Sequence, residues 1–193
     1  MSRLLIATNN QGKVKEIKAI LGGFYDEIVS LKDAGISLEV VEDGDSFEAN
    51  AIKKAREAAD LAGCDALADD SGLCVDALGG APGIYSARYA GDDATDNQNN
   101  EKLLQALDGI ASRSARFVSV VALVSGGTVT TASGEVCGVI AHAPSGGGGF
   151  GYDPLFFVPE LGQTFAEIPA EIKNSLSHRA RALTALRKKL ADV

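Results

Sequence analysis

The sequence predicts a mixed α/β protein in which helices flank a sheet that is not purely parallel. Near the N-terminus, an apolar strand at residues 4–7 leads into a polar loop and then a helix. Later, the apolar and β-branched residues 116–124 are followed by Gly126-Gly127 and a second strand at 128–132, which predicts a hairpin. Hairpin strands interspersed with helices favour a mixed sheet.

Two helices are predicted in the first third of the chain. The first follows Lys13 and ends at Gly22-Gly23, and one of its faces is apolar at helical spacing: Val14, Ile17, Ile20 and Leu21. The second covers residues 47–62 and stops at Gly63, with an inner stripe of Ala51, Ala55, Ala58 and Ala62. A short strand then leads to Asp69.

The second half of the chain continues the alternation of strands and helices. Thr95 to Gln98 has the form of a capping box and opens a helix that runs to Leu107. More strand is expected at 136–140 and at 155–158. The last helix has Ser177 as its expected N-cap and an apolar face formed by Leu183, Leu186 and Leu190. The glycine run 146–149 indicates a mobile loop.

The composition fits one globular domain, residues 1–193, with 46% hydrophobic and 23% charged residues. No apolar run approaches the roughly 20 residues that span a membrane, and the apolar stretch at the start is too short for a signal peptide.

Three cysteines without C-x-x-C spacing argue against a zinc site or a disulfide framework and are typical of a cytoplasmic protein. A net charge of −8 argues against non-specific binding to nucleic acid, although local cations and Mg²⁺ can still hold a nucleotide.

The adjacent carboxyl groups of Asp69 and Asp70 are the strongest chemical signal. Like charges about 4 Å apart repel by about 4 kcal/mol at an effective dielectric constant of about 20, and a divalent cation or a catalytic proton is the usual compensation. Successive residues of a strand point to opposite faces, so we expect only one of the two to face the chemistry. A solvated acidic turn is the alternative that this motif leaves open.

The loop Thr8-Asn9-Asn10-Gln11-Gly12-Lys13 joins the first strand to the first helix. It brings a hydroxyl, amides and an ammonium to a helix N-terminus, which suits a phosphate group. The chain has no Walker A motif, and an ordinary capped loop is the alternative. Before the second helix, one acid of the segment Glu42-Asp43-Gly44-Asp45 can share a cation with an acid at 69–70, although acids at this place more often only complement the helix dipole.

Two further groups of residues follow in the C-terminal half. Phe150 and Tyr152 can stack on a flat ring while Asp153 accepts a hydrogen bond from a base edge; alternatively, the two aromatic rings pack in the core. The G-x-G-x-x-G match that overlaps this segment precedes no helix, which excludes a Rossmann loop. His178 and Arg179 fall in the first turn of a helix, where cations are disfavoured, so an anion or an oxo group is expected nearby; a lone surface His-Arg pair is the alternative.

These motifs, taken in order along nearly the whole chain, resemble the inosine triphosphate pyrophosphatase family, which removes non-standard purine nucleotides. The matching segments are the loop at 8–13, Phe47 to Ala51, Ala68 to Leu73, Gly79 to Tyr89, Gly149 to Pro154 and Ser177-His178-Arg179. The resemblance implies an elongated, mixed β-sheet with flanking helices, two lobes with a central nucleotide cleft, and a homodimer. It also implies Mg²⁺-dependent conversion of ITP, dITP and XTP to the monophosphate and pyrophosphate.

The resemblance implies a role for each matching residue. Glu42 and Asp70 hold the metal, and Asp70 is also the base. The loop residues Thr8, Asn9, Asn10, Gln11, Gly12 and Lys13 hold phosphate, as does Lys54, and Ser71 contacts the substrate. Base and phosphates are surrounded by Phe150, Gly151, Tyr152, Asp153, Lys173, His178 and Arg179.

A mechanism follows from these expectations. Asp70 positions or deprotonates a water that attacks within the α–β phosphoanhydride, and lysines stabilise the leaving pyrophosphate. A 6-oxo group accepts hydrogen bonds where adenine donates them, so buried donors reject ATP by on the order of 10⁴-fold; Arg179 and the backbone N–H groups at 150–153 are the expected donors. The alternatives are a nucleotide-binding module without hydrolysis and a pyrophosphatase for modified pyrimidine or other nucleotides.

Overall fold

The computed structural model of the chain describes residues 2–191, and its seven strands form one sheet in the order β2-β1-β3-β4-β5-β6-β7. The strands are β1 (Arg3–Ile6), β2 (Glu27–Ser30), β3 (Asp65–Val75), β4 (Ser114–Ser125), β5 (Thr128–Ile140), β6 (Phe156–Val158) and β7 (Gln163–Thr164). β1 pairs in parallel with β2 and β3, whereas β6 is antiparallel to both β5 and β7. The prediction of a mixed sheet is therefore confirmed.

The longer helices lie where the sequence predicts them. The helices are α1 (Gln11–Leu21), α2 (Phe47–Ala62), α3 (Asp96–Ala106), α4 (Ala170–Leu176) and α5 (His178–Ala191), with short 3₁₀ turns η1 (Asp76–Leu78) and η2 (Gly83–Arg88). The predicted capping box at Thr95 and Gln98 is present, and Gly63 ends α2 in the left-handed conformation at φ 62°. No helix in the part of the chain that the structure describes is long and apolar enough to cross a membrane.

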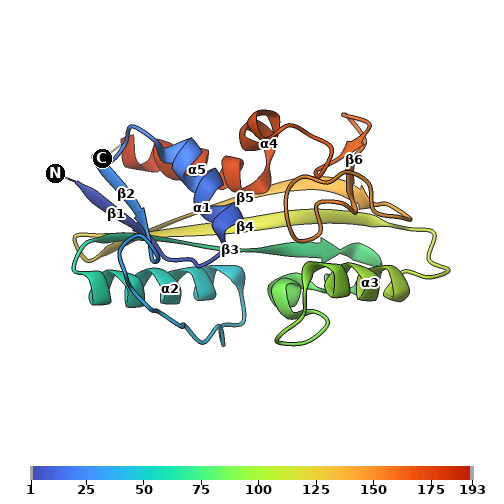
Figure 1. Cartoon of the computed structure of the whole chain (residues 1–193), viewed down its shortest axis with the longest axis horizontal. Helices are drawn as coiled ribbons and strands as arrows, with labels where there is room; N and C mark the ends of the chain where they lie inside the picture. The colour runs from blue at the N-terminus through green and yellow to red at the C-terminus, as the bar shows by residue number, and fades with distance from the viewer. Residues whose placement is uncertain (1, 192–193) are drawn as a thin grey trace. The chain divides into compact units, whose positions relative to one another are not determined.

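The chain divides into two compact units. Unit 1 consists of Met1–Asp70, Ser119–Gly134 and His178–Val193, and unit 2 consists of Ser71–Val118 and Glu135–Ser177. In unit 1, α1 and α5 cover one face of the strands and α2 covers the other (Figure 1). In unit 2, three phenylalanine rings meet at centroid distances of 4.6–5.8 Å in the core: Phe117, Phe156 and Phe165.

Alternation along β3 explains the two layers of unit 1. Leu67 packs with Ile17 of α1 and Leu183 of α5, while Ala66 and Ala68 pack with the alanine stripe of α2. Because successive strand residues point to opposite faces, Asp69 continues the Leu67 side and Asp70 continues the Ala68 side. The strand thus carries one carboxylate into each layer.

Several boundaries differ from the sequence prediction. β3 does not stop at Asp69 but continues through both acids to Val75, because each carboxylate is buried beside a cation and the backbone keeps pairing. β5 is one strand over 128–140 rather than two. The short elements β2, β7 and α4 were not predicted; with two to seven residues each, they have too few positions for a periodic pattern.

Candidate active site

Asp69 and Asp70 lie side by side on β3 and take different cations. Both are buried, at 2% and 5% exposure. Asp69 pairs with Lys13 of α1, and Asp70 pairs with Lys54 of α2, which covers the other face of β3. The predicted divergence of the two carboxylates is confirmed, and the alternative of a solvated acidic turn is wrong.

Asp69 is the centre of a buried ion-pair network. Its Oδ2 lies 2.7 Å from Lys13 Nζ and 3.2 Å from a terminal nitrogen of Arg179, and its Oδ1 accepts a 2.5 Å hydrogen bond from the Ser119 hydroxyl. Arg179 also pairs with Glu16 of α1. Burial raises the pKa of Asp69, but the two cations outweigh this and hold the pKa well below its usual value. Asp69 is therefore a fixed negative charge.

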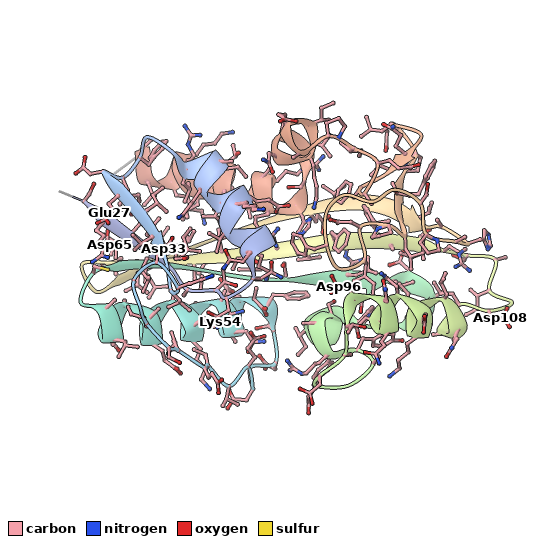
Figure 2. All side chains as sticks on the ribbon, in the orientation of Figure 1. Glu27, Asp33, Lys54, Asp65, Asp96 and Asp108 are labelled. Carbon is pink, nitrogen blue, oxygen red and sulfur yellow. The ribbon has the colours of Figure 1, made fainter. Side chains whose placement is uncertain are left out.

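Asp70 has a different environment, organised by Lys54. The Lys54 ammonium donates to Glu42 Oε1, to the Asp69 carbonyl oxygen and to Asp70 Oδ1, each at 3.1 Å. Figure 2 marks Lys54 on α2, below the strands of unit 1. Burial raises the pKa of Asp70, and the attraction of Lys54 only partly offsets this rise. A buried carboxyl group with a raised pKa suits proton transfer.

The Asp70 group also fits a divalent cation. Its second oxygen, Oδ2, is buried and has no hydrogen-bond partner among residues 2–191. The same residues contain no group of three or more acidic, histidine or cysteine side chains arranged for a metal. A cation here would thus take at most two protein carboxylates, Asp70 and Glu42, and its remaining ligands from water and phosphate, which is the pattern typical of Mg²⁺.

The predicted phosphate loop has the geometry of a helix N-terminus. Asn10 is the N-cap of α1, and its side chain accepts the Lys13 N–H at 3.1 Å. Asn9, Asn10 and Gln11 are exposed, and Thr8 and Gly12 are partly exposed. Phosphate binding by this loop stays a prediction, which its exposed amides and N–H groups favour.

In unit 2, Asp153 holds the second group of candidate residues together. Its Oδ2 accepts a 2.7 Å bond from the Lys173 ammonium and a 2.9 Å bond from the Phe150 N–H. The Lys173 ammonium lies 4.9 Å from the centroid of the Phe150 ring. Gly149, at φ 72°, leaves room for this carboxylate, because a Cβ at that position would collide with it. The glycine run thus has a steric role, and its predicted mobility stays a prediction.

Several of the donors expected for base recognition have partners inside the protein. The Phe150 N–H bonds to Asp153, and the Gly151 N–H donates to Asp96 at 2.7 Å. Arg179 is 1% exposed and pairs with carboxylates, so anions lie beside it, and its donation to the base stays a prediction. Among the candidates of unit 2, Lys173 is a charged donor beside the half-buried Phe150 ring.

The two aromatic candidates separate in the structure. Tyr152 is buried in the core of unit 2, and its hydroxyl donates to the Ser86 carbonyl at 2.8 Å, so the core-packing alternative describes this ring. Phe150 is only half-buried. His178 is buried in the first turn of α5, and Ser71 follows Asp70 on β3. A contact of these residues with substrate stays a prediction.

Comparison with known proteins places the chain in a family. The model of the Ham1 family matches residues 4–189. The chain belongs to the Ham1 family. A relative from Geobacter sulfurreducens, named dITP/XTP pyrophosphatase, is 55% identical over 98% of this chain and 97% of its own length. Another of the same name, from Listeria innocua, is 51% identical over 100% of this chain and 97% of its own.

Solved structures agree with this assignment. The Ham1 protein of Staphylococcus aureus is 41% identical and superposes with a TM-score of 0.87 over 99% of both chains. A HAM1 protein from Coxiella burnetii is 39% identical, with a TM-score of 0.89 over the full length of both chains. The fold predicted for this Ham1-family protein from its sequence, a mixed α/β sheet with flanking helices, is thereby confirmed.

Sequence reasoning missed part of the site of this Ham1-family protein. Asp69 had no assigned role, and Glu16 and Ser119 were not recognised. Glu16 carries a usable signal, because it is an acid one turn after Lys13 on the face of α1 that contains Ile17. Its partner Arg179 lies 163 residues away in the sequence, so no local pattern connects the two.

Proposed function

We propose that this Ham1-family chain hydrolyses the non-standard purine nucleoside triphosphates ITP, dITP and XTP to the monophosphate and pyrophosphate. The buried Asp70 carboxyl group, held by Lys54 through Oδ1 while Oδ2 lacks a partner in residues 2–191, is the observation that carries the proposal. Relatives named dITP/XTP pyrophosphatase, about half identical over nearly the whole chain, support the substrate class.

Asp70 acts on the attacking water in this proposal. Its raised pKa makes the carboxylate a better proton acceptor than an exposed aspartate, and Lys54 fixes the orientation of the group through Oδ1. Glu42 and Asp70 would hold Mg²⁺, which when bound neutralises phosphate charge and polarises the phosphoanhydride. A water held by Asp70 Oδ2 then loses its proton to this carboxylate as it attacks phosphorus.

Two buried lysines can pair with the negative charge of the triphosphate. Burial lowers the pKa of Lys13, and the attraction of Asp69 opposes this shift, so the ammonium is a desolvated donor at the N-terminus of α1. Lys54 keeps a raised pKa because Asp70 and Glu42 outweigh its desolvation. We assign Lys13 and Lys54, with residues 8–13 around the N-terminus of α1, to phosphate binding, and Lys173 to base recognition. Partly desolvated, prepositioned cations stabilise the charge of the leaving pyrophosphate.

Base selection depends on Lys173 and Phe150 in this proposal. A purine stacked on Phe150 would bring its 6-oxo group toward the Lys173 ammonium, which lies 4.9 Å from that ring. An amino group at the same position, as in adenine, offers the ammonium a donor instead of an acceptor. Such a mismatch costs on the order of 10⁴-fold in kcat/KM where the site excludes water. Arg179 pairs with Asp69 and Glu16, so its guanidinium also holds the surroundings of Asp69.

A substrate panel tests the proposal. Pyrophosphate release is measured with Mg²⁺ and dITP, XTP, ITP, GTP, ATP and modified pyrimidine triphosphates, for the wild type and for Asp70→Asn. We expect dITP, XTP and ITP to be preferred and Asp70→Asn to fold but turn over about 100-fold more slowly. Asp43→Asn, an exposed acid near Glu42, is the matched control and should retain its activity. Nucleotide binding without pyrophosphate release would favour a non-hydrolysing module, and preference for pyrimidine nucleotides would favour the other alternative.

We further propose that the protein is a cytoplasmic homodimer, as its resemblance to the family implies. Three cysteines without metal-binding spacing support a reducing compartment, and the structure leaves all three unpaired. Light scattering on the purified chain measures the assembly, and a mass of one 19.9 kDa chain at micromolar concentration would contradict a stable dimer.

A further inference from the structure

The segment that carries Glu42 has no regular structure of its own. Residues 36–44 form neither helix nor strand, and α2 begins only after the N-cap Ser46. A carboxylate on such a segment needs other contacts to hold it in place for a cation. Glu42 itself reaches Lys54 of α2 at 3.1 Å, which ties the side chain but not the backbone that bears it.

Asn50 of α2 supplies the backbone contact. Its Oδ1 accepts a 2.9 Å hydrogen bond from the N–H of Gly44, two residues after Glu42. The contact is closely packed: a Cβ on Gly44 would lie 2.6 Å from Asn50 Oδ1 and 3.0 Å from the Ala49 Cβ. A glycine is therefore required for the segment to approach α2 this closely.

The Nδ2 group of Asn50 forms no hydrogen bond in the described part of the chain that would explain why this buried position carries an amide. Asn50 is 0% exposed, and within residues 2–191 its Nδ2 has no hydrogen-bond partner. A buried donor without a partner lowers stability, whereas an apolar side chain of this size would fill the same space without that cost. The value of Asn50 thus lies in the bond that its Oδ1 accepts from Gly44.

The two contacts together fix the direction of Glu42. Asn50 and Lys54 are four residues apart on α2, so their side chains lie on the same helix face, one turn apart. Asn50 holds the backbone of the segment, and the Lys54 ammonium bonds to the carboxylates of both Glu42 and Asp70 at 3.1 Å.

We propose that Asn50 is a positioning residue: by holding Gly44, it keeps Glu42 beside Asp70 so that the two carboxylates bind one divalent cation. The inference rests on the proposed function, because it assumes that Glu42 and Asp70 bind the metal of the reaction. Asn50 contacts neither metal nor substrate in this role. Residues that orient metal ligands typically contribute about 10- to 100-fold to metal affinity.

The contact can be broken from either side. Asn50→Leu removes the acceptor and keeps the number and branching of the side-chain heavy atoms, and Gly44→Ala keeps the acceptor but forces the segment away from α2. Lys53→Ala is the matched control, since it breaks the exposed 2.7 Å ion pair between Lys53 and Asp43 of the same segment. Each variant is titrated with Mn²⁺, followed by its EPR signal, in the presence of the non-hydrolysable α,β-methylene analogue of dITP. Melting temperature and the Mg²⁺ dependence of turnover are measured in parallel.

We expect each single variant to bind Mn²⁺ about tenfold more weakly, and the double variant to bind it no more weakly than the worse single one, because both changes break one contact. The Mg²⁺ concentration for half-maximal turnover should rise in parallel, while kcat at saturating Mg²⁺ stays within about threefold of the wild type. Lys53→Ala should leave all these values unchanged. A merely structural role would lower the melting temperature without changing the affinity for Mn²⁺.

Wild-type Mn²⁺ affinity in Asn50→Leu and Gly44→Ala would overturn the inference, as would additive losses in the double variant. If Asn50→Leu does not fold, Gly44→Ala alone decides between the two outcomes. Failure of the proposed function is distinguishable, because the wild type itself would then release no pyrophosphate from dITP or would bind no Mn²⁺ with the analogue.

Discussion

Replacing Asp69 by asparagine should destabilise the protein far more than any change to its exposed acids. Asp69 Oδ2 lies 2.7 Å from Lys13 Nζ and 3.2 Å from the Arg179 guanidinium, and Asp69 and Arg179 are buried. At an effective dielectric constant of about 20 these distances correspond to attractions of about 6 and about 5 kcal/mol before desolvation. Desolvation of the charges offsets much of this, so the intact network is worth less than those figures.

Removing the Asp69 carboxylate should lower the free energy of unfolding by more than the intact ion-pair network contributes to it, because charged partners then stay buried without their counter-ion. Asparagine keeps the size of the side chain and its hydrogen bond with Ser119, but it removes the carboxylate that pairs with Lys13 and Arg179. Breaking a buried ion pair from one side costs about 3–5 kcal/mol. For a chain of this length, that corresponds to a loss of about 10 °C in melting temperature.

The assay is urea unfolding followed by far-ultraviolet circular dichroism, since the chain contains no tryptophan. Asp43→Asn serves as the control, because Asp43 is exposed and its loss should not change the midpoint. A loss of less than about 1 kcal/mol in Asp69→Asn would refute the reasoning, since it would mean that the two cations are stabilised without this carboxylate.

The pH dependence gives a second check with a definite sign. The pKa of Asp69 is lowered in the folded state, so its contribution is fully present above the unfolded pKa of about 3.9 and is lost as the pH falls through the folded value. The stability difference between wild type and Asp69→Asn should therefore be constant near neutral pH and shrink below about pH 4. The pKa of Asp70 is raised, so the wild type should lose stability relative to Asp70→Asn as the pH rises from about 4 through the folded pKa.

Three further outcomes test the other parts of the site. Lys13→Ala should weaken binding of the α,β-methylene analogue of dITP by about tenfold or more while leaving deoxyinosine binding within about twofold, measured by calorimetry; equal losses for both ligands would count against the phosphate cradle. Lys173→Met should lower kcat/KM for dITP more than for dATP in a pyrophosphate-release assay, and an unchanged ratio would remove Lys173 from base selection. Gly149→Ala should lower the free energy of unfolding by about 2 kcal/mol, because it strains a left-handed backbone and collides with the Asp153 carboxylate. Gly147→Ala, where a Cβ meets nothing within 4 Å, is its control, and similar stability of the two variants would contradict this reasoning.

Local patterns were sufficient for most of the architecture. Residues 47–62 form a helix with the predicted bounds, the glycine pair 126–127 joins two neighbouring strands, and Thr95 caps α3 as its spacing with Gln98 indicates. The divergence of Asp69 and Asp70 also followed from sequence, because alternation is a property of any strand. These features depend on neighbours within one turn of helix or two residues of strand.

The partners of the charged side chains depended on contacts between distant segments. Arg179 takes its anions from Glu16 and Asp69, which are 163 and 110 residues away, so no local pattern could identify this ion-pair network. The N–H groups expected to face the base were likewise engaged by Asp96 and Asp153.

Residue types and spacing therefore established most of the longer elements and the family whose chemistry the chain shares. The packing of the elements established which acid remains a fixed charge and which keeps a buried oxygen without a partner in residues 2–191. The physical reason is that helical and strand periodicity act over a few residues, whereas the charge state and availability of a side chain depend on burial and on groups brought near it only when the chain folds.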